Sequence, residues 1–165
     1  MNSQSEDTRQ AIEQYGPLVL QMAWRILPDA EEVKDIYQDT FLQFHVALNK
    51  GEVIEFPKAW LCRVALRAAC KRQRQRRRLT LFDEDTPGPT APIADAKELE
   101  RKMLLERVRQ LAAELPERQR EVFVLRNFED LSFAEIATAL GCSAETARAN
   151  EYQALKKLRA WMRLD

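Results

Sequence analysis

Apolar residues recur at spacings of three and four along most of the chain, which is the pattern of amphipathic α-helices. In the N-terminal half, this pattern predicts helices over residues 8–26, 30–48 and 57–78. Asp29 is placed to cap the second helix, and Pro57 suits the first turn of the third. Pro17 interrupts the first pattern, so this helix either starts at Pro17 or bends there.

The amino-acid composition changes in the middle of the chain. Residues 79–95 contain three prolines, a glycine and the acidic run Asp83, Glu84 and Asp85, which is typical of a linker. Beyond it, the apolar spacing predicts a helix from about Ala96, and Pro116 opens a further one. The sequence therefore predicts an all-α protein of two small helical domains, residues 8–78 and 98–165, joined by a flexible linker over residues 79–97.

The stretch from 131 to 159 carries the signals of a helix-turn-helix. Ser132 and Glu135 form a capping box, which starts a short helix. Gly141 suits the tight turn that ends this helix, and Ser143 is a second cap for the helix that follows. Two helices joined by a turn of about three residues with a central glycine indicate a DNA-binding motif. The alternative is an ordinary antiparallel helix pair in an all-α core.

In a helix-turn-helix, the N-terminal part of the second helix lies in the DNA major groove. Glu145 can accept a hydrogen bond from a cytosine amino group, and Arg148 can donate two to guanine. This helix therefore carries side chains suited to reading base edges.

The charged residues are unevenly distributed along the chain, although the net charge is zero. Residues 56–82 contain nine basic residues and no acidic one, and six of the basic residues lie within residues 71–78. A helix dipole favours cations at this end, but so many would repel one another without a polyanion nearby. With Lys58, Trp60 and Arg63 at the start of the helix, nucleic acid is the expected partner. The acidic residues between 31 and 39 resemble an ordinary solvated helix face.

Composition narrows the class of protein. No apolar run approaches the ~20 residues that span a bilayer, and the polar N-terminus lacks a signal-peptide pattern, so we expect a cytoplasmic protein without membrane insertion. Cys62, Cys70 and Cys142 form no CxxC pair, so we expect free thiols and no metal centre. A single histidine, His45, and the lack of a glycine-rich phosphate loop argue against an enzyme and against a bound cofactor.

Three segments together resemble a bacterial RNA polymerase sigma factor. They are DAEEVKDIYQDTFLQF, FPKAWLCRVA with its basic tail, and, after the proline-rich linker, LPERQREVFVLRNFEDLSFAEIATALGCS. The resemblance is to the extracytoplasmic-function group, which has only sigma regions 2 and 4. It implies a promoter-specificity subunit that binds core RNA polymerase and promoter DNA, melts the minus-ten element and reads the minus-thirty-five element. The alternative is a free-standing helix-turn-helix regulator that binds duplex DNA without polymerase.

The resemblance also implies roles for individual residues. Docking on the β′ clamp of the polymerase falls to Asp35, Gln38, Asp39 and Phe41. Contact with the minus-ten element falls to Asn49, Lys50, Lys58, Trp60, Arg63, Arg67, Lys71 and Arg72. Contact with the minus-thirty-five element falls to Arg118, Arg120, Ser143, Glu145, Thr146, Arg148, Ala149, Tyr152 and Lys156.

The family further implies a second polymerase contact at the β flap, and regulation by an anti-sigma factor. Nothing in the chain suggests a homo-oligomer. Two positions depart from the family pattern: members commonly carry an Arg-Asn pair where this chain has Leu66 and Arg67, and an apolar or aromatic residue where it has Glu151.

Overall fold

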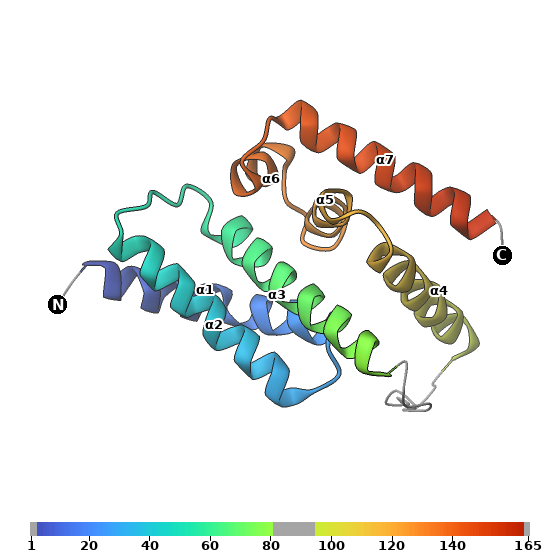
Figure 1. The fold of residues 1–165 in the computed structure, drawn as a ribbon, viewed down its shortest axis with the longest axis horizontal. Coiled ribbons are helices and arrows are strands. Elements are labelled where there is room, and N and C mark those ends of the chain that lie inside the picture. The colour runs from blue at the N-terminus through green and yellow to red at the C-terminus, as the bar shows by residue number, and fades with distance from the viewer. Residues whose placement is uncertain (1–2, 81–94, 164–165) are drawn as a thin grey trace.

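The computed structural model describes residues 3–80 and 95–163, and within these ranges the chain forms helices and no strand. In chain order the helices are α1 (Ser3–Ile26), α2 (Ala30–Asn49), α3 (Pro57–Thr80), α4 (Ala96–Ala113), α5 (Glu117–Asn127), α6 (Phe133–Leu140) and α7 (Ala144–Arg163). The predicted all-α class is confirmed. Figure 1 shows α3 running between α1 and α2 on one side and α5 and α6 on the other.

Helix α1 is longer than the sequence pattern predicted. It begins at Ser3 and continues through Pro17, so the alternative in which the helix starts at Pro17 is wrong. Proline lacks a backbone N–H and therefore costs the helix one hydrogen bond. Close packing holds this part of the helix in place: Gly16 is buried, and a Cβ atom added there would lie 3.0 Å from the hydroxyl oxygen of Tyr37. The missing side chain lets α1 and α2 approach at this point.

Helices α2 and α3 begin where the sequence placed them. The Oδ1 atom of Asp29 accepts hydrogen bonds from the backbone N–H groups of Glu31 and Glu32, at 2.9 and 3.0 Å. This cap pairs two of the donors that a helix N-terminus leaves free. Pro57 is the first residue of α3, and the apolar side of that helix, with Leu61 and Ala65, is fully buried.

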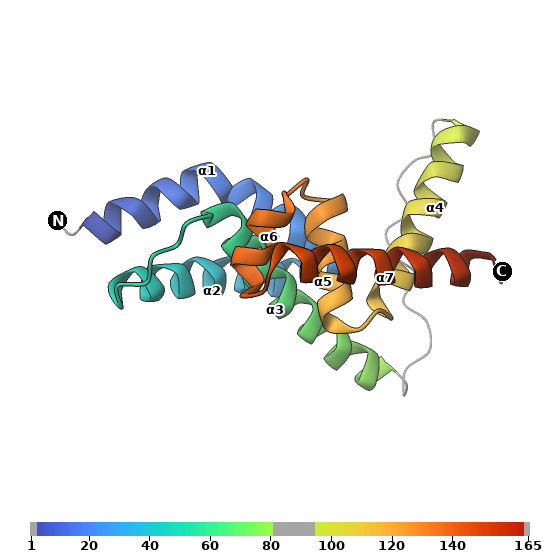
Figure 2. The same ribbon diagram turned by 90° about the horizontal axis from the view of Figure 1, so that it is seen from above.

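The predicted linker over residues 79–97 lies mostly outside the described residues, and so does its acidic run. Its two ends belong to helices, because α3 extends to Thr80 and α4 begins at Ala96 with Asp95 as its cap. Figure 2 shows α4 extending away from the other helices, with its N-terminal end outermost. Within the described residues, none of the helices is long and apolar enough to cross a membrane.

The helix-turn-helix forms as the local signals predicted. The backbone N–H of Glu135 donates to the Ser132 hydroxyl at 3.1 Å, and the Ser132 N–H donates to the Glu135 carboxylate at 2.7 Å. Gly141 ends α6 with φ of 65°, in the left-handed region that favours glycine. Ser143 then accepts from the N–H of Thr146 at 3.1 Å, as a cap of α7.

The two halves of the chain pack against each other through α3. One hydrophobic cluster contains Leu66 and Cys70 of α3 together with Val122 and Leu125 of α5. A second cluster joins the C-terminal end of α4 to α5 and α7. The sequence had predicted two domains without an orientation, and the structure places them in direct contact.

We expect Ser132→Ala to lower the free energy of unfolding by about 1 kcal/mol, because it removes the hydroxyl that caps α6. Urea unfolding followed by circular dichroism measures this. Thr138→Ala is the matched control, since Thr138 is exposed on the same helix and caps nothing. An equal loss in both variants would contradict the capping role.

Candidate nucleic-acid interface

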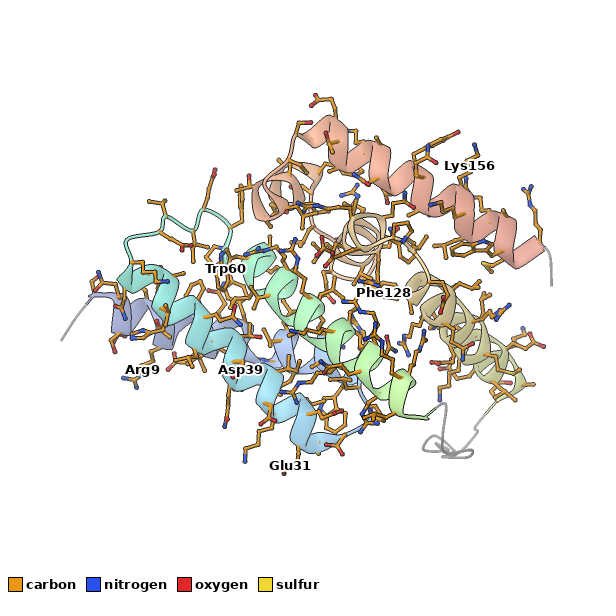
Figure 3. The ribbon with its side chains drawn as sticks, viewed as in Figure 1. Arg9, Glu31, Asp39, Trp60, Phe128 and Lys156 are labelled. Carbon is orange, nitrogen blue, oxygen red and sulfur yellow. The ribbon has the colours of Figure 1, made fainter. Side chains whose placement is uncertain are left out.

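The outer face of α2 carries the acidic residues that the sequence singled out for docking. Asp35, Gln38 and Asp39 are all exposed, and Figure 3 shows Asp39 on the edge of α2 that faces away from α3. The fourth predicted docking residue, Phe41, is 4% exposed, and its ring packs edge-on against Tyr37 with 5.0 Å between the ring centres. Phe41 therefore belongs to the core, and its prediction as a surface contact is wrong, because its position in the helix turns it inward.

The same face of α2 continues as an apolar surface that the sequence analysis missed. Leu42 is 61% exposed and Val46 is 41% exposed, although both are large apolar residues. They recur at intervals of three and four with Asp35 and Asp39, so the four residues share one stripe. Apolar residues on the polar side of a predicted helix were the signal that could have revealed this surface.

A cavity of about 430 Å³ opens where the C-terminal end of α2 meets the start of α3. Leu42 and Val46 form one wall, Trp60 and Arg63 form another, and Lys50 and Glu52 close the rim. The Arg63 guanidinium lies 5.5 Å from the centre of the Trp60 ring, within range of a cation–π interaction. Figure 3 places Trp60 at this junction. The cavity thus offers an aromatic surface and a cation side by side.

Burial shapes the chemistry of Arg63. Burial, and next the neighbouring Arg67, lower the pKa of the Arg63 guanidinium, although an arginine stays charged at any physiological pH. Its Nε atom is buried and has no hydrogen-bond partner within the described part of the chain. A buried donor without a partner favours a ligand with acceptor atoms.

Asn49 and Lys50 are exposed where α2 ends. The Asn49 amide lies 2.9 Å from Nε2 of His45, and Nδ1 of the same ring lies 3.0 Å from the Thr8 hydroxyl. That hydroxyl donates its proton to the Gln4 carbonyl oxygen at 2.7 Å. The ring therefore donates from Nδ1 and accepts the Asn49 amide at Nε2, which holds Asn49 in one orientation.

Groups of the second domain bind two of the cations predicted to contact the minus-ten element. Arg67 forms an ion pair with Glu121, a carboxylate that is 1% exposed. The Lys58 ammonium donates to the backbone carbonyl of Glu129 at 3.0 Å, and the Glu129 carboxylate pairs with Arg25. The hydrogen bond to Glu121 raises the pKa of Arg67. In this arrangement both Lys58 and Arg67 make contacts within the protein with which a DNA phosphate would compete.

The basic end of α3 is also partly neutralised within the molecule. Arg72 pairs with Asp35 at 3.3 Å, and Arg76 pairs with Glu32 at 2.6 Å, while Lys71 is exposed. The argument that this run of cations needs a polyanion is therefore wrong in part, because α2 supplies carboxylates across the helix pair. Spacing along one helix could not reveal partners on another.

The predicted duplex-contacting residues of α7 lie on its exposed side. These residues are Glu145, Thr146, Arg148, Ala149, Tyr152 and Lys156, preceded by Ser143 in the turn. Figure 3 shows Lys156 on the side of α7 that faces away from the other helices. The Arg148 guanidinium lies 5.2 Å from the ring centre of Phe133, and that of Arg126 lies 4.7 Å from it. Stacking on Phe133 restricts the orientations of Arg148 before any DNA is bound.

The two predicted contacts on α5 have different outcomes. Arg118 has a half-exposed side chain and lies 3.7 Å from the Glu121 carboxylate. Arg120 is 6% exposed and points into the contact between the domains, where its Nη1 atom lies 3.4 Å from the Ala113 carbonyl oxygen. The prediction of Arg120 as a surface contact is wrong in this arrangement, since no duplex can reach it.

The structure accounts for both departures from the family pattern. Leu66 is 1% exposed and packs in the cluster that joins the domains, so an apolar residue is favoured there. Glu151 accepts a hydrogen bond from the Asn127 side chain at 3.0 Å, and Asn127 also donates to the Phe123 carbonyl oxygen at 2.9 Å. Glu151 thus ties α7 to the end of α5.

Burial determines the chemistry of the cysteines. Burial, and next the charge of Glu129, raise the pKa of Cys62 to about 12. Burial also raises the pKa of Cys70, whereas Cys142 is partly exposed. All three are free thiols. Among the residues that the structure describes, no group of three or more His, Cys, Asp or Glu side chains is placed to hold a metal ion.

Comparison with protein families gives two matches in chain order. The family model for sigma-70 region 2 matches residues 11–79, and that for sigma-70 region 4 matches residues 105–158. The RNA polymerase sigma-E factor of Streptomyces coelicolor is 31% identical over 141 residues, which is 86% of this chain and 77% of the relative. The ECF RNA polymerase sigma factor SigW of Bacillus subtilis is 24% identical over 162 residues, or 90% of this chain and 85% of the relative.

A solved structure shares the fold over nearly the whole chain. It is CnrH in complex with the cytosolic domain of CnrY, with a TM-score of 0.63 and 25% sequence identity. The similarity covers 98% of this chain and 90% of CnrH.

Thiol-reactive reagents should distinguish the three cysteines. We expect Cys142 to react at least 100-fold faster than Cys62 and Cys70 at pH 8, because a thiol with a raised pKa forms little thiolate and burial blocks access. Mass spectrometry of timed labelling measures the order. Cys142→Ser should remove the fast phase, and rapid labelling of Cys62 in the folded protein would contradict its burial.

Proposed function

The chain belongs to the sigma-70 family of RNA polymerase sigma factors, in its extracytoplasmic-function group, and we propose how its two domains divide promoter recognition between them. A sigma factor directs core RNA polymerase to promoters, and the match of both regions does not fit a free-standing DNA-binding regulator. The finer assignments to residues 8–78 and 98–165 are the subject of the proposal.

The exposed stripe of α2 docks on the polymerase. Asp35, Gln38 and Asp39 supply the acidic half of this surface, and Leu42 and Val46 supply the apolar half. Apolar side chains bury area on binding, while the carboxylates orient the partner and exclude acidic surfaces. In the family, this segment meets the coiled coil of the β′ clamp, and we assign the same partner here.

The cavity between α2 and α3 receives an unstacked base of the minus-ten element. Trp60 offers a face for stacking, and Arg63 offers a cation and an unpaired buried donor beside it. Stacking a base on an aromatic side chain contributes roughly 1–3 kcal/mol, which offsets much of the cost of removing the base from the duplex. This juxtaposition is the observation that carries the proposal. Lys50 at the cavity and Lys71 further along α3 are exposed and can contact the backbone of the same strand.

Helix α7 reads the minus-thirty-five element as duplex. Its exposed side presents Glu145 and Arg148 near the N-terminal end, where a recognition helix meets base edges, and Lys156 further along for a phosphate. The stacking of Arg148 on Phe133 lowers the entropy lost when Arg148 binds a base.

The packed arrangement of the two domains is a resting state that opens for transcription. Glu121 holds Arg67, and the Glu129 backbone holds Lys58, so the minus-ten surface is incomplete until the domains separate. CnrH, which shares this fold, was solved in complex with the cytosolic domain of CnrY. We propose that a protein partner of the anti-sigma class holds this chain in a comparable way. We assign this chain to the cytoplasm, because the polymerase and promoter DNA on which it acts are there. RNA synthesis itself is catalysed by the polymerase.

Run-off transcription with core RNA polymerase and a library of promoter fragments tests the assignments. We expect start sites that depend on the full-length protein and share two spaced upstream motifs. Trp60→Ala should lower dependent transcription at least tenfold, because it removes the stacking surface, and should leave polymerase binding intact, because Asp35 and Asp39 remain. The Trp60 ring also packs edge-on against Phe44, so circular dichroism checks that the variant is folded. Asp39→Arg should lower both, because it reverses the charge of the docking surface.

Glu98→Arg is the matched control for Asp39→Arg, since it reverses the same charge at an exposed position on α4. Polymerase binding is measured separately by co-purification of core enzyme with the full chain. Equal polymerase binding by wild type and Asp39→Arg would refute the docking surface. Dependent transcription by Trp60→Ala at the wild-type level would refute the base pocket.

Opening of the domains gives a separate prediction. Glu121→Gln should raise the affinity of the free protein for a single-stranded minus-ten oligonucleotide severalfold, because it removes the carboxylate that holds Arg67. Fluorescence anisotropy at fixed salt concentration measures this affinity. Glu100→Gln is the matched control, since it removes the same charge from an exposed position on α4. A decrease in affinity would show that Glu121 aids DNA binding instead.

A further inference from the structure

A second cavity, of about 70 Å³, lies between the two domains and belongs to none of the surfaces assigned above. Its walls come from α1, α3, α4 and α5, together with Phe128, which Figure 3 shows between the two halves of the molecule. Most of the lining is apolar, from Met22, Ile26, Leu66 and Val124.

Two arginines that line this cavity have buried Nε atoms without a hydrogen-bond partner among the described residues. Arg120 is 6% exposed, its Nε atom has no hydrogen-bond partner among the described residues, and its Nη1 atom makes only the long contact with the Ala113 carbonyl. The Nε atom of Arg109 is buried and also unpaired within the same part of the chain, and its nearest carboxylate, on Glu106, lies 3.7 Å away from Nη1. By contrast, Arg25 in the same wall is paired with Glu129.

Such a site selects a narrow class of ligand. A buried guanidinium nitrogen without a hydrogen bond is costly, and an anion with two acceptor oxygens matches the planar donors of arginine. The apolar walls gain free energy only if the ligand also brings hydrocarbon into contact with them. At roughly 10–15 Å³ for each water-sized group, the cavity holds about five to seven such groups. A carboxylate with an aliphatic chain of four or five carbons meets all three requirements.

We propose that this cavity binds a short-chain aliphatic carboxylate. The carboxylate accepts hydrogen bonds from Arg120 and Arg109, and the chain packs against Leu66, Val124 and Phe128. Because the lining comes from both domains, the ligand stabilises the packed arrangement over the open one. Binding of the carboxylate does not depend on the proposed function. A ligand that keeps the domains packed should also inhibit transcription, and this consequence rests on the proposed function.

Isothermal titration of the full-length protein with sodium pentanoate tests the site, at constant ionic strength and pH 7. Pentanamide is the matched neutral ligand, and sodium sulfate tests for an anion site without an apolar requirement. We expect pentanoate to bind and to raise the unfolding temperature, with pentanamide at least tenfold weaker. Binding of sulfate as tight as that of pentanoate, or no heat from 10 mM pentanoate, would overturn the proposal.

Variants distinguish binding at this cavity from a general effect of the protein's charge. Arg120→Gln should weaken pentanoate binding at least tenfold. Because Arg120 is buried and its loss could impair folding, Arg109→Gln provides a second variant on a part-exposed side chain, with an expected loss of about threefold. Arg101→Gln is the matched control, since it removes the same charge from an exposed position on α4. Unchanged binding in a folded Arg109→Gln protein, or an equal loss in Arg101→Gln, would refute the assigned contacts.

Discussion

The ion pair between Arg67 and Glu121 is the constraint on which the arrangement of this molecule depends. Glu121 is almost fully buried where α3 meets α5, and a carboxylate removed from water must be paired. Its partner, Arg67, is also a cation that we assign to the minus-ten surface. The Glu121 carboxylate holds two of the guanidinium nitrogens, so packing of the domains competes with binding of the promoter strand at this side chain.

Other contacts between the domains also favour the packed arrangement. Glu129 is buried, pairs with Arg25 through its carboxylate and receives Lys58 through its backbone carbonyl. Leu66 fills the adjacent apolar contact, at a position where the family pattern implied a polar pair. The two domains therefore meet through side chains that suit the packed state, and the departure at Leu66 is a consequence of this contact.

Helix α2 carries different kinds of side chain on its different faces, because residues three and four positions apart share a face. One face packs on α1 and α3, and Phe41 belongs to it. The outer face offers carboxylates near its N-terminal end and exposed apolar side chains near its C-terminal end, where it borders the cavity with Trp60. The surfaces that we propose for docking on polymerase and for capture of a base thus adjoin each other on α2.

The sequence by itself determined the features that depend on neighbours within a few residues. The capping box at Ser132, the left-handed turn at Gly141 and the cap at Asp29 all appear as predicted, because their physics is local. The helical spacing of apolar residues and the order of the motifs also sufficed to predict the all-α class and the family. The outcome at Pro17 was different, because packing against α2 holds a helix through a residue that local propensity disfavours.

Only the tertiary structure decided which cations and which faces are free. Arg72 and Arg76 are paired by carboxylates of α2, and Arg120 is buried between the domains, whereas the sequence showed all three simply as basic residues. The same holds for the cavity between the domains, whose walls come from helices far apart in the chain. Burial and ion pairing depend on distances between elements, and these distances arise from the packing of whole helices, which no local pattern records.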